Sequence, residues 1–488
     1  MFGKRPTTLF AGALMLGLTG TAFADAASDA EALRAEVQQL RSEVATLRQS
    51  SDSNWLNERR AEEIKGLIRD VLSDAETRAT LLQDGMMAGN QDGRFFLKSA
   101  DGNYLLNISA FAQIRYAADF QAGRPAGTGG NDQNQFQLRR AKIRFDGHVV
   151  DPAWGYFFQL ATNQPRDEQS TNQGAVGLSN GYVFMEEVGM TYQVNDQMKI
   201  TAGVAKIPFL REFLLYETDL LAVDRSSATE FFNIGRSALV QLDYEANDWL
   251  HAAVAFSNGS RTQFNPITTN PNNSYQTGYA NFGSNLNTFS VTLRADAKIA
   301  GDWDQEKDFV AWRGDDMAAF VGAAINWEEG DQSVNGAVGG NVDYFSYTVD
   351  GLYKQNGLSL MGSFMGALYR DTDGGFVNRD QYGATAYAAY MVTDQFQPFI
   401  RGSWINDGQA GTEDIIGATF GANYYFHKQN ARLTFDVQWF FQGDAPNAAA
   451  YAFARNPFGP QLSLNNPLND RISDENIVAV RAQFQVAF

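Results

Sequence analysis

The residues best suited to do chemistry form a short run of alternating cations in the segment from Phe136 to Val149. Arg140, Lys142 and Arg144 occupy every second position, and apolar residues lie between them. Successive side chains of a β-strand point to opposite faces, so the three cations would share one face. Such a ladder could act on anions in a polar lumen. The alternative is that these charges only hydrate and brace the inner wall of a barrel.

Other cations are expected on the same inner face, because they occupy the polar positions of segments that also alternate. These residues are Arg115, Arg294, Arg432 and Arg481. Lys206 is added with an ambiguous orientation, since it lies where its segment ends. Inward positions would be about 6.6 to 6.8 Å apart along a strand. This spacing is within the Debye length of roughly 8 Å at physiological salt, so their potentials would overlap.

The segment from Pro208 to Gly235 is the best candidate for a loop that folds into such a lumen. Its many apolar residues, Phe209 and Leu220 among them, would be costly on an exposed loop. Its charged residues are mainly acidic: Arg211, Glu212, Glu217, Asp219, Asp224, Arg225 and Glu230. An acidic loop facing a basic wall would set a transverse field across the narrowest point, which orders water and favours small polar solutes.

From Asn103 to the C-terminus, the chain has the periodicity of β-strands. Sixteen segments of about ten to fifteen residues alternate between apolar and polar side chains. Short turns alternate with long connections, as in barrels whose turns and loops lie on opposite sides of a membrane. The connection 299–315 is an exception, and we expect it to be a long excursion on the short-turn side. The last segment alternates up to Phe488 and should pair with the first, because lipid cannot satisfy an open strand edge.

The N-terminus and the composition indicate an exported protein. Residues 1–24 carry Lys4 and Arg5, an apolar stretch and small residues up to Ala24, which is typical of a cleavable signal peptide. No later stretch reaches the roughly 20 apolar residues of a helical span. The chain has 36 phenylalanines, 19 tyrosines and 45 glycines, no cysteine and a net charge of −18. The aromatic and glycine content suits strands and turns, and the acidity argues against nucleic acid as a partner.

Residues 25–50 show a heptad pattern with opposite charges at the flanking positions, which predicts a coiled coil. The apolar seam consists of Leu33, Val37, Leu40, Val44 and Leu47. Valine at a with leucine at d favours two strands. A lone amphipathic helix is the alternative, because three heptads are the lower limit for a coiled coil. Residues 51–90 are expected to continue as a helical linker.

Catalysis, metal binding and cofactors are not expected. The three histidines, His148, His251 and His427, lie at unrelated places. None has the spacing of metal ligands or an accompanying nucleophile motif.

Several short motifs follow one another in an order that is more specific than any of them alone. They are the first hairpin from Lys98 to Leu106, the run Leu138 to Lys142 followed by Trp154-Gly155-Tyr156, the stretch Gly203 to Phe209, the turn Ala300 to Trp303, and the terminal Phe488. With them, the chain from about Gly93 to Phe488 resembles the family of phosphate-selective porins of the O and P type.

This resemblance implies a sixteen-stranded trimeric barrel of the bacterial outer membrane, with the third loop folded inward and anions passing along basic residues. Only Arg140, Lys142 and Arg144, and in addition Lys206, are carried over as binding residues. The acidic loop departs from the phosphate-specific pattern and argues against assigning anion specificity. The N-terminal heptads look like the periplasmic extension by which some outer-membrane proteins reach the cell wall.

Overall, we predict an all-β fold, a 16-stranded antiparallel transmembrane β-barrel preceded by a periplasmic α-helical coiled coil. The expected parts are a signal peptide (1–24), the coiled coil (25–50), a helical linker (51–90) and the barrel (91–488). The expected function is passive diffusion of small hydrophilic solutes, with a preference for anions such as phosphate left open. The alternative is an architectural anchor that links the lipid bilayer to peptidoglycan or to a periplasmic partner. A homotrimer is expected in either case.

Overall fold

The computed structural model describes residues 34–43, 86–91, 93–121, 132–163, 183–259, 287–330, 342–371, 378–406, 408, 414–442 and 477–488. The chain divides into two units, Met1–Gln83 and Asp84–Phe488. In the first unit, residues 34–43 are described and form an α-helix in which Val37 and Leu40 are exposed. The expected signal peptide and the seam residues Leu33, Val44 and Leu47 lie outside the described residues. Among the helices that the structure describes, none is both long and apolar enough to cross a membrane.

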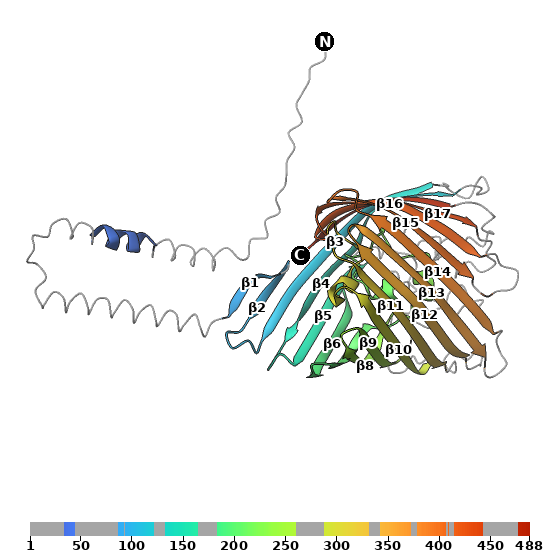
Figure 1. The fold of residues 1–488 in the computed structure, drawn as a ribbon, viewed down its shortest axis with the longest axis horizontal. Coiled ribbons are helices and arrows are strands. Elements are labelled where there is room, and N and C mark those ends of the chain that lie inside the picture. Colours follow the sequence, from blue (N-terminus) through green and yellow to red (C-terminus); the bar gives the residue numbers. More distant parts are fainter. Residues whose placement is uncertain are drawn as a thin grey trace, which may run out of the picture. The chain divides into compact units, whose positions relative to one another are not determined.

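The second unit contains a closed antiparallel barrel of sixteen strands, which confirms the predicted barrel (Figure 1). Each strand from β3 to β18 pairs with the next, and β18 pairs with β3. The strands are β3 (Leu105–Gln121), β4 (Asp132–His148), β5 (Trp154–Asn163), β6 (Phe184–Asn195), β7 (Met198–Lys206), β8 (Arg236–Asn247), β9 (Leu250–Ser257), β10 (Asn287–Ala300), β11 (Ala318–Gly330), β12 (Val342–Gln355), β13 (Leu358–Asp371), β14 (Arg379–Tyr390), β15 (Phe396–Asn406), β16 (Ile415–His427), β17 (Ala431–Gln442) and β18 (Ile477–Ala487).

The final strand closes the barrel, as the alternation up to the C-terminus indicates. The register runs from Ile477 opposite Gln121 to Ala487 opposite Phe111. Beyond it, the backbones of Phe488 and Ala110 exchange two hydrogen bonds of 2.9 Å. Because the barrel is closed, neither β3 nor β18 has an open edge along this stretch. A lipid environment requires such closure, since it cannot satisfy unpaired backbone groups.

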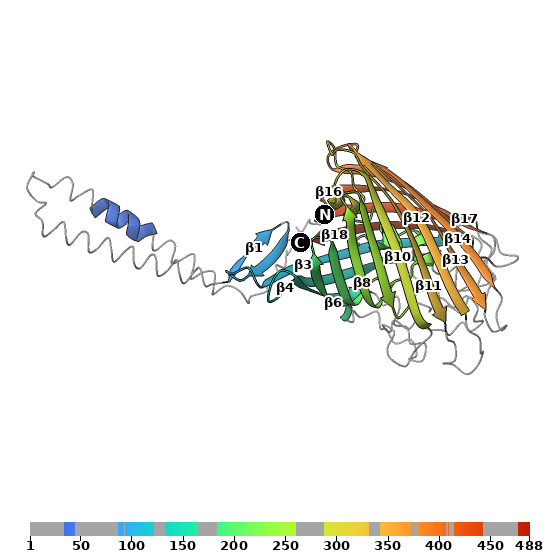
Figure 2. The same ribbon diagram turned by 60° about the horizontal axis from the view of Figure 1, so that its bottom comes forward.

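A short hairpin precedes the barrel and corrects the expected helical linker, which was predicted to reach residue 90. Strands β1 (Met87–Gln91) and β2 (Arg94–Lys98) pair with each other, and β2 pairs with the start of β3, just past the C-terminus (Figure 2). The Phe95 and Phe488 rings contact each other at 5.5 Å. The helical prediction is wrong for β1 because Gly89 and Asn90 are poor helix formers, whereas pairing with β2 satisfies the backbone.

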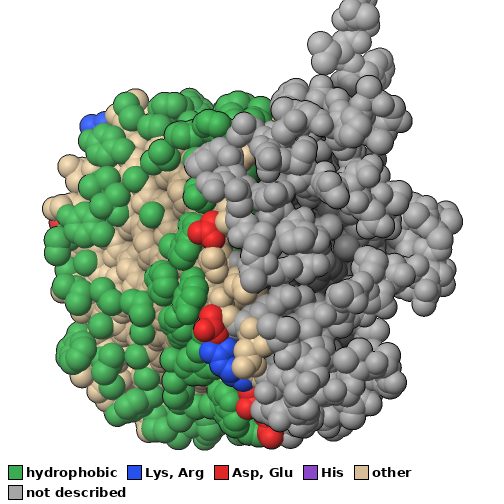
Figure 3. Space-filling view, turned by 90° about the vertical axis from the view of Figure 1, so that its right-hand side faces the viewer, with side chains coloured by type: hydrophobic (Ala, Val, Ile, Leu, Met, Phe, Trp, Pro, Cys, Tyr) green, Lys and Arg blue, Asp and Glu red, His purple; other side chains and the backbone are tan. Residues whose placement is uncertain are grey.

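The two faces of the wall have opposite chemistry. In β17, Leu433 and Phe435 are 40% and 46% exposed, whereas Thr434 and Asp436 on the inner face are 1% and 0% exposed. Hydrophobic side chains are spread over much of the outer wall in Figure 3. An apolar surface of this extent is not found on soluble monomers and fits contact with lipid.

Two connections fold into the barrel and pack against its inner wall. The connection from β7 to β8 contains the helices α3 (Arg211–Leu214) and α4 (Ser227–Phe232), and we call it loop 208–235. The connection from β10 to β11 contains the 3-10 helix η1 (Trp303–Lys307), and we call it segment 301–317. The apolar cluster around Phe309 includes Leu220 and Leu221 of loop 208–235, so the two connections pack together. The expected long excursion is therefore largely internal.

Candidate functional site

Loop 208–235 attaches to one half of the barrel wall through apolar contacts. Phe209 and Phe213, near α3, and Phe231 and Phe232, in α4, are at most 6% exposed. Their cluster includes inward residues of β11, β12, β13, β15, β16 and β17: Ala324, Tyr344, Met365, Ala367, Ile405, Ile415 and Phe440. Burying each large side chain stabilises this position of the loop by roughly 1.5–3 kcal/mol. The apolar content of the loop is therefore explained by packing inside the barrel.

The same loop attaches to the closing seam of the barrel through one carboxylate. Asp224 contacts the guanidinium groups of Arg115 at 2.6 Å, Arg139 and Arg140 at 3.0 Å, and Arg481 at 3.5 Å. These arginines come from β3, β4 and β18, the strands at and beside the seam. Burial alone would raise the pKa of Asp224, but the surrounding arginines hold it well below its usual value of 3.8. Asp224 is therefore ionised, and it neutralises part of a strongly positive patch.

A second ionic cluster is centred on Glu217 of the loop. Lys142 lies 3.0 Å from Glu217 and 2.6 Å from Glu186, and Arg236 lies 2.7 Å from Glu187. Further ion pairs join Arg225 to Glu217 at 3.4 Å and Arg144 to Glu187 at 3.1 Å. The cations of the predicted ladder thus have carboxylate partners on the loop and on β6.

A third cluster joins the loop to the opposite wall and to segment 301–317. Arg211 lies 2.7 Å from Asp296 and 2.5 Å from Asp350, and it also pairs with Glu306. Arg294 lies 2.9 Å from Asp350. Both inserted connections are therefore fixed to the wall by buried charge pairs, which are costly to break because a lost partner leaves an unpaired charge.

Sequence reasoning missed Arg139, Glu186 and Glu187 because two β-bulges break the alternation. It also did not single out the other partners, which are Arg236, Asp296, Glu306 and Asp350. Along β4, Gln113 pairs with Arg140 and Ile114 with Leu138, so Arg139 is an extra residue that also reaches Asp224. A second register shift lies beside Glu186 and Glu187 of β6, and both of their side chains are buried. Adjacent like charges in an alternating strand were the available signal, since otherwise one of them would face lipid.

The remaining predicted residues stabilise the loop or the wall. The Lys206 ammonium donates to the carbonyl oxygens of Leu214 and Leu215 at 3.2 and 2.9 Å. The Glu212 carboxylate accepts hydrogen bonds from the Ser226 amide at 2.9 Å, from its hydroxyl at 2.8 Å and from the Tyr387 hydroxyl. Arg432 donates to the side chain of Gln429 at 2.9 Å, and Glu230 is a half-buried residue of α4.

These positions correct the expected lining of the pore. Arg115, Arg140, Arg294, Arg432 and Arg481 point inward as predicted, but each is at most 4% exposed and does not line open space. The expected transverse field across a gap is also wrong for Asp224 and Glu217, because these carboxylates touch the wall cations directly. The loop was expected to face the wall across a gap. Burial of its apolar side chains stabilises direct contact between the loop and the wall instead.

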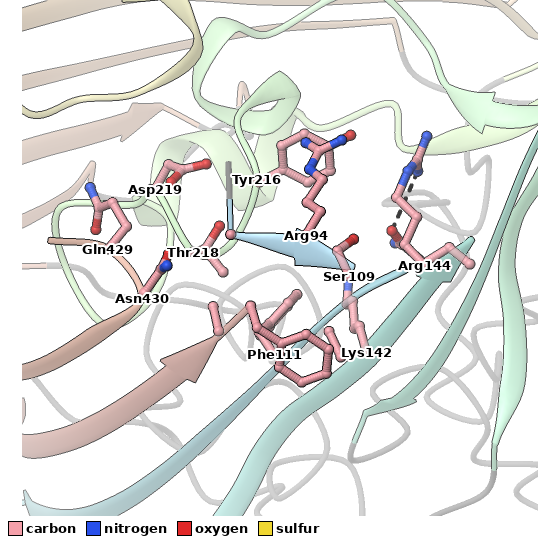
Figure 4. A pocket seen from close by; sticks show the side chains of 15 residues that line it. Arg94, Ser109, Phe111, Lys142, Arg144, Tyr216, Thr218, Asp219, Gln429 and Asn430 are labelled. Carbon is pink, nitrogen blue, oxygen red and sulfur yellow. Dashed lines mark hydrogen bonds between the residues drawn. The ribbon is translucent and has the colours of Figure 1, made fainter. Parts of the chain in front are cut away.

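Open space is found beside the loop, in a cavity of about 230 Å³ (Figure 4). Its walls come from β3, β4 and β5, from Tyr216, Thr218 and Asp219 of the loop, from the turn before β17, and from the hairpin and the C-terminus. Lys142 and half-buried Arg144 are the ladder residues that reach it. Burial, with a further contribution from Asp308, raises the pKa of Asp219 to about 7.

The three histidines remain apart, on β4, β9 and β16. Within the described part of the chain, no group of three or more histidine, aspartate or glutamate side chains is placed to hold a metal ion.

The chain is similar to several solved structures, and the first of those named here supports the barrel fold. An anion-selective porin from Comamonas acidovorans is 11% identical, with 78% of this chain and 99% of that chain covered and a TM-score of 0.50. The outer membrane channel DcaP of Acinetobacter baumannii is 12% identical, with 78% and 97% covered and a TM-score of 0.46. OmpT of Vibrio cholerae is 11% identical, with 82% and 100% covered and a TM-score of 0.44. No curated protein matches the chain.

A family model gives the more specific result. The model described as phosphate-selective porin O and P matches residues 112–287, which run from β3 through β9. This stretch includes the cation ladder, both bulges and loop 208–235. The chain therefore has the fold of a porin-type β-barrel and, over residues 112–287, matches the model of the phosphate-selective porin O and P family that its sequence resembles.

Proposed function

We propose that the protein is a passive diffusion channel for small hydrophilic solutes. The observation that carries this proposal is the cavity beside loop 208–235, because it is a polar space inside a wall whose outer face is apolar. In a barrel with 16 strands, the interior is wide enough for water, and an inserted loop narrows it. Solutes would pass on the side of the loop that faces β3, β4 and β5.

The paired charges support a weak selectivity rather than a strong anion preference. Each of Lys142 and Arg144, the ladder residues that reach the cavity, has carboxylate partners within 3.3 Å. A neutralised cation exerts little net field on a passing ion. The anion selectivity named for the Comamonas porin does not transfer, since the likeness extends to the fold alone.

The purified full chain should form discrete conducting steps when added to a planar lipid bilayer. The expected chloride-to-potassium permeability ratio, from reversal potentials in a salt gradient, is within about threefold of one, since paired charges give only a weak field. Protein unfolded by boiling serves as the control. A folded barrel that inserts without any conducting step would refute the channel proposal.

An architectural role is the second candidate, and the apolar packing inside the barrel favours it. Loop 208–235 and segment 301–317 bury apolar clusters inside the barrel, which would obstruct a wide channel. In the described helix of the first unit all residues are exposed, and Val37 and Leu40 have the heptad spacing of a seam that could pack on a partner helix. We therefore propose that this helix forms a periplasmic coiled coil and could tie the outer membrane to peptidoglycan or to a protein.

We further propose that the barrels form a homotrimer independently of the helices. Deleting residues 25–85, which leaves the hairpin β1–β2 intact, should preserve the trimer, because the heptads favour two strands rather than three. Native gel electrophoresis and light scattering of the deletion variant and the full chain check this result. If the deletion variant ran as a monomer, the trimer would depend on the N-terminal unit and not on the barrel.

A further inference from the structure

The two less exposed cations of the cavity beside loop 208–235 are compensated. Lys142 lies 2.6 Å from Glu186 and 3.0 Å from Glu217. Arg144 lies 3.3 Å from Asp146 and 3.1 Å from Glu187. Arg94, at the tip of the hairpin, is about half exposed and lies 3.9 Å from Asp146, which Arg144 also contacts. The cavity therefore lacks the converging free cations that hold an anion tightly.

The acidic side chain of the cavity does not favour anions either. Asp219 lines the same space and makes no ion pair among the described residues. An anion that entered would meet this carboxyl beside cations that already have carboxylate partners. A compact cation would find no cluster of ligating carboxylates within the described residues. The balance of charge favours an uncharged solute.

The cavity does offer polar groups. The buried Nε2 of Gln429 has no hydrogen-bond partner among the described residues, and the Ser109 hydroxyl and the side-chain amide of Asn430 line the same space. Figure 4 shows Gln429 and Asn430 on one side of the cavity and Ser109 on the other. A hydroxyl group both donates and accepts, so a solute with several hydroxyls could satisfy amide and hydroxyl groups on both sides.

Aromatic rings form the remaining walls. Tyr216 of the loop is 41% exposed, and Phe111 of β3 lies in the lower part of the view in Figure 4. Arg144 and Lys206 lie 5.9 and 5.4 Å from the centre of the Tyr216 ring and help to fix it. An exposed ring in a polar cavity gives dispersion contacts to the C–H face of a solute whose edges carry hydroxyls.

We infer that this cavity binds an uncharged polyhydroxylated solute of about the size of a monosaccharide. The volume of about 230 Å³ would hold roughly eight water molecules at ~30 Å³ each, which a ring with several hydroxyls could replace. The inference deepens the proposed channel function, since it names the solute class of that same passage. It predicts that neutral sugars permeate better than charged solutes of similar size.

The test is saturation-transfer NMR on the full chain in detergent micelles, with D-glucose as the probe and succinate and inorganic phosphate as comparators. Glucose should bind, and both anions should bind at least tenfold more weakly. Tyr216→Ala should weaken glucose binding about tenfold, and Tyr216→Phe should restore it because the ring is retained. Tyr104→Ala is the matched control, since Tyr104 is an exposed tyrosine of the turn between β2 and β3 that does not line the cavity.

The possible outcomes distinguish the proposed sugar site from the proposed channel function. Tighter binding of phosphate or succinate than of glucose would overturn the inference, as would equal losses in Tyr216→Ala and Tyr104→Ala. Conducting steps in a bilayer without glucose binding would refute the sugar site and leave the channel standing. Glucose binding that depends on Tyr216, in a barrel that never conducts, would keep the site and refute the channel.

Discussion

Replacing Asp224 with asparagine should release loop 208–235 from the closing seam of the barrel and make the protein more anion-selective. The change leaves Arg115, Arg139, Arg140 and Arg481 without the carboxylate that all four contact. Removing one partner from a buried ion pair costs about 3–5 kcal/mol, because unpaired charge stays buried. Amides of the loop should therefore exchange with deuterium roughly 10²- to 10³-fold faster.

The same variant should raise the chloride-to-potassium permeability ratio, since Arg115, Arg139 and Arg140 lose the carboxylate that they share, while Arg481 keeps Asp436 at 2.7 Å. Asp219→Asn is the matched control, because Asp219 lies in the same loop and makes no ion pair among the described residues. It should change loop exchange at neutral pH by no more than about twofold, in keeping with the small effects of removing an unpaired group. Equal exchange rates in wild type and Asp224→Asn would show that the apolar contacts alone hold the loop.

The triple variant Arg140→Gln, Lys142→Gln and Arg144→Gln should shift selectivity strongly toward cations. It removes three cations and leaves Glu186, Glu187 and Glu217 with fewer partners. Two unit charges 4 Å apart interact by about 4 kcal/mol at an effective dielectric near 20. We expect a roughly tenfold lower chloride-to-potassium ratio at low ionic strength, and a smaller effect at high salt, where screening is stronger.

A second variant tests whether charge balance is the cause. It combines the three glutamines with Glu186→Gln, Glu187→Gln and Glu217→Gln, so that three cations and three carboxylates are removed and the net charge equals that of the wild type. Asp224, Asp146 and Arg236 keep their charges. Its permeability ratio should return close to that of the wild type, although the loop loses its ionic contacts through Glu217. If the triple variant already conducts with the wild-type ratio, the ladder is structural and does not act on permeating ions.

The barrel itself could be predicted from the sequence because lipid imposes a strict rule on each strand. In β17, every apolar residue of the run Leu433, Phe435, Val437 and Trp439 must face outward, so the alternation alone assigns the faces. The closure of β18 onto β3 follows from the same rule, since an open edge cannot be satisfied in lipid. The inward direction of Arg115, Arg294 and Arg481 was predictable for this reason.

The ionic partners required the tertiary structure. Strict alternation would place Arg139 and Arg140 on opposite faces of β4, and Glu186 and Glu187 on opposite faces of β6. Each bulge inserts one residue, so that both charges of a pair point inward. The position of a bulge depends on the register between two paired strands. The sequence of one strand alone therefore does not reliably predict it. The sequence did show paired like charges at both places, which is the only local trace of the bulges.

The contact between the inserted loop and the inner wall was also decided by the tertiary structure. The sequence contained an acidic, apolar loop and a basic wall, and this composition fits a loop across a gap as well as a loop in contact. Side chains from six strands form the apolar surface that Phe209, Phe231 and Phe232 bury against, and these strands are far from the loop in sequence. Only the closed barrel brings them together. The sequence therefore determined which faces are polar, and the tertiary structure decided which charges remain free.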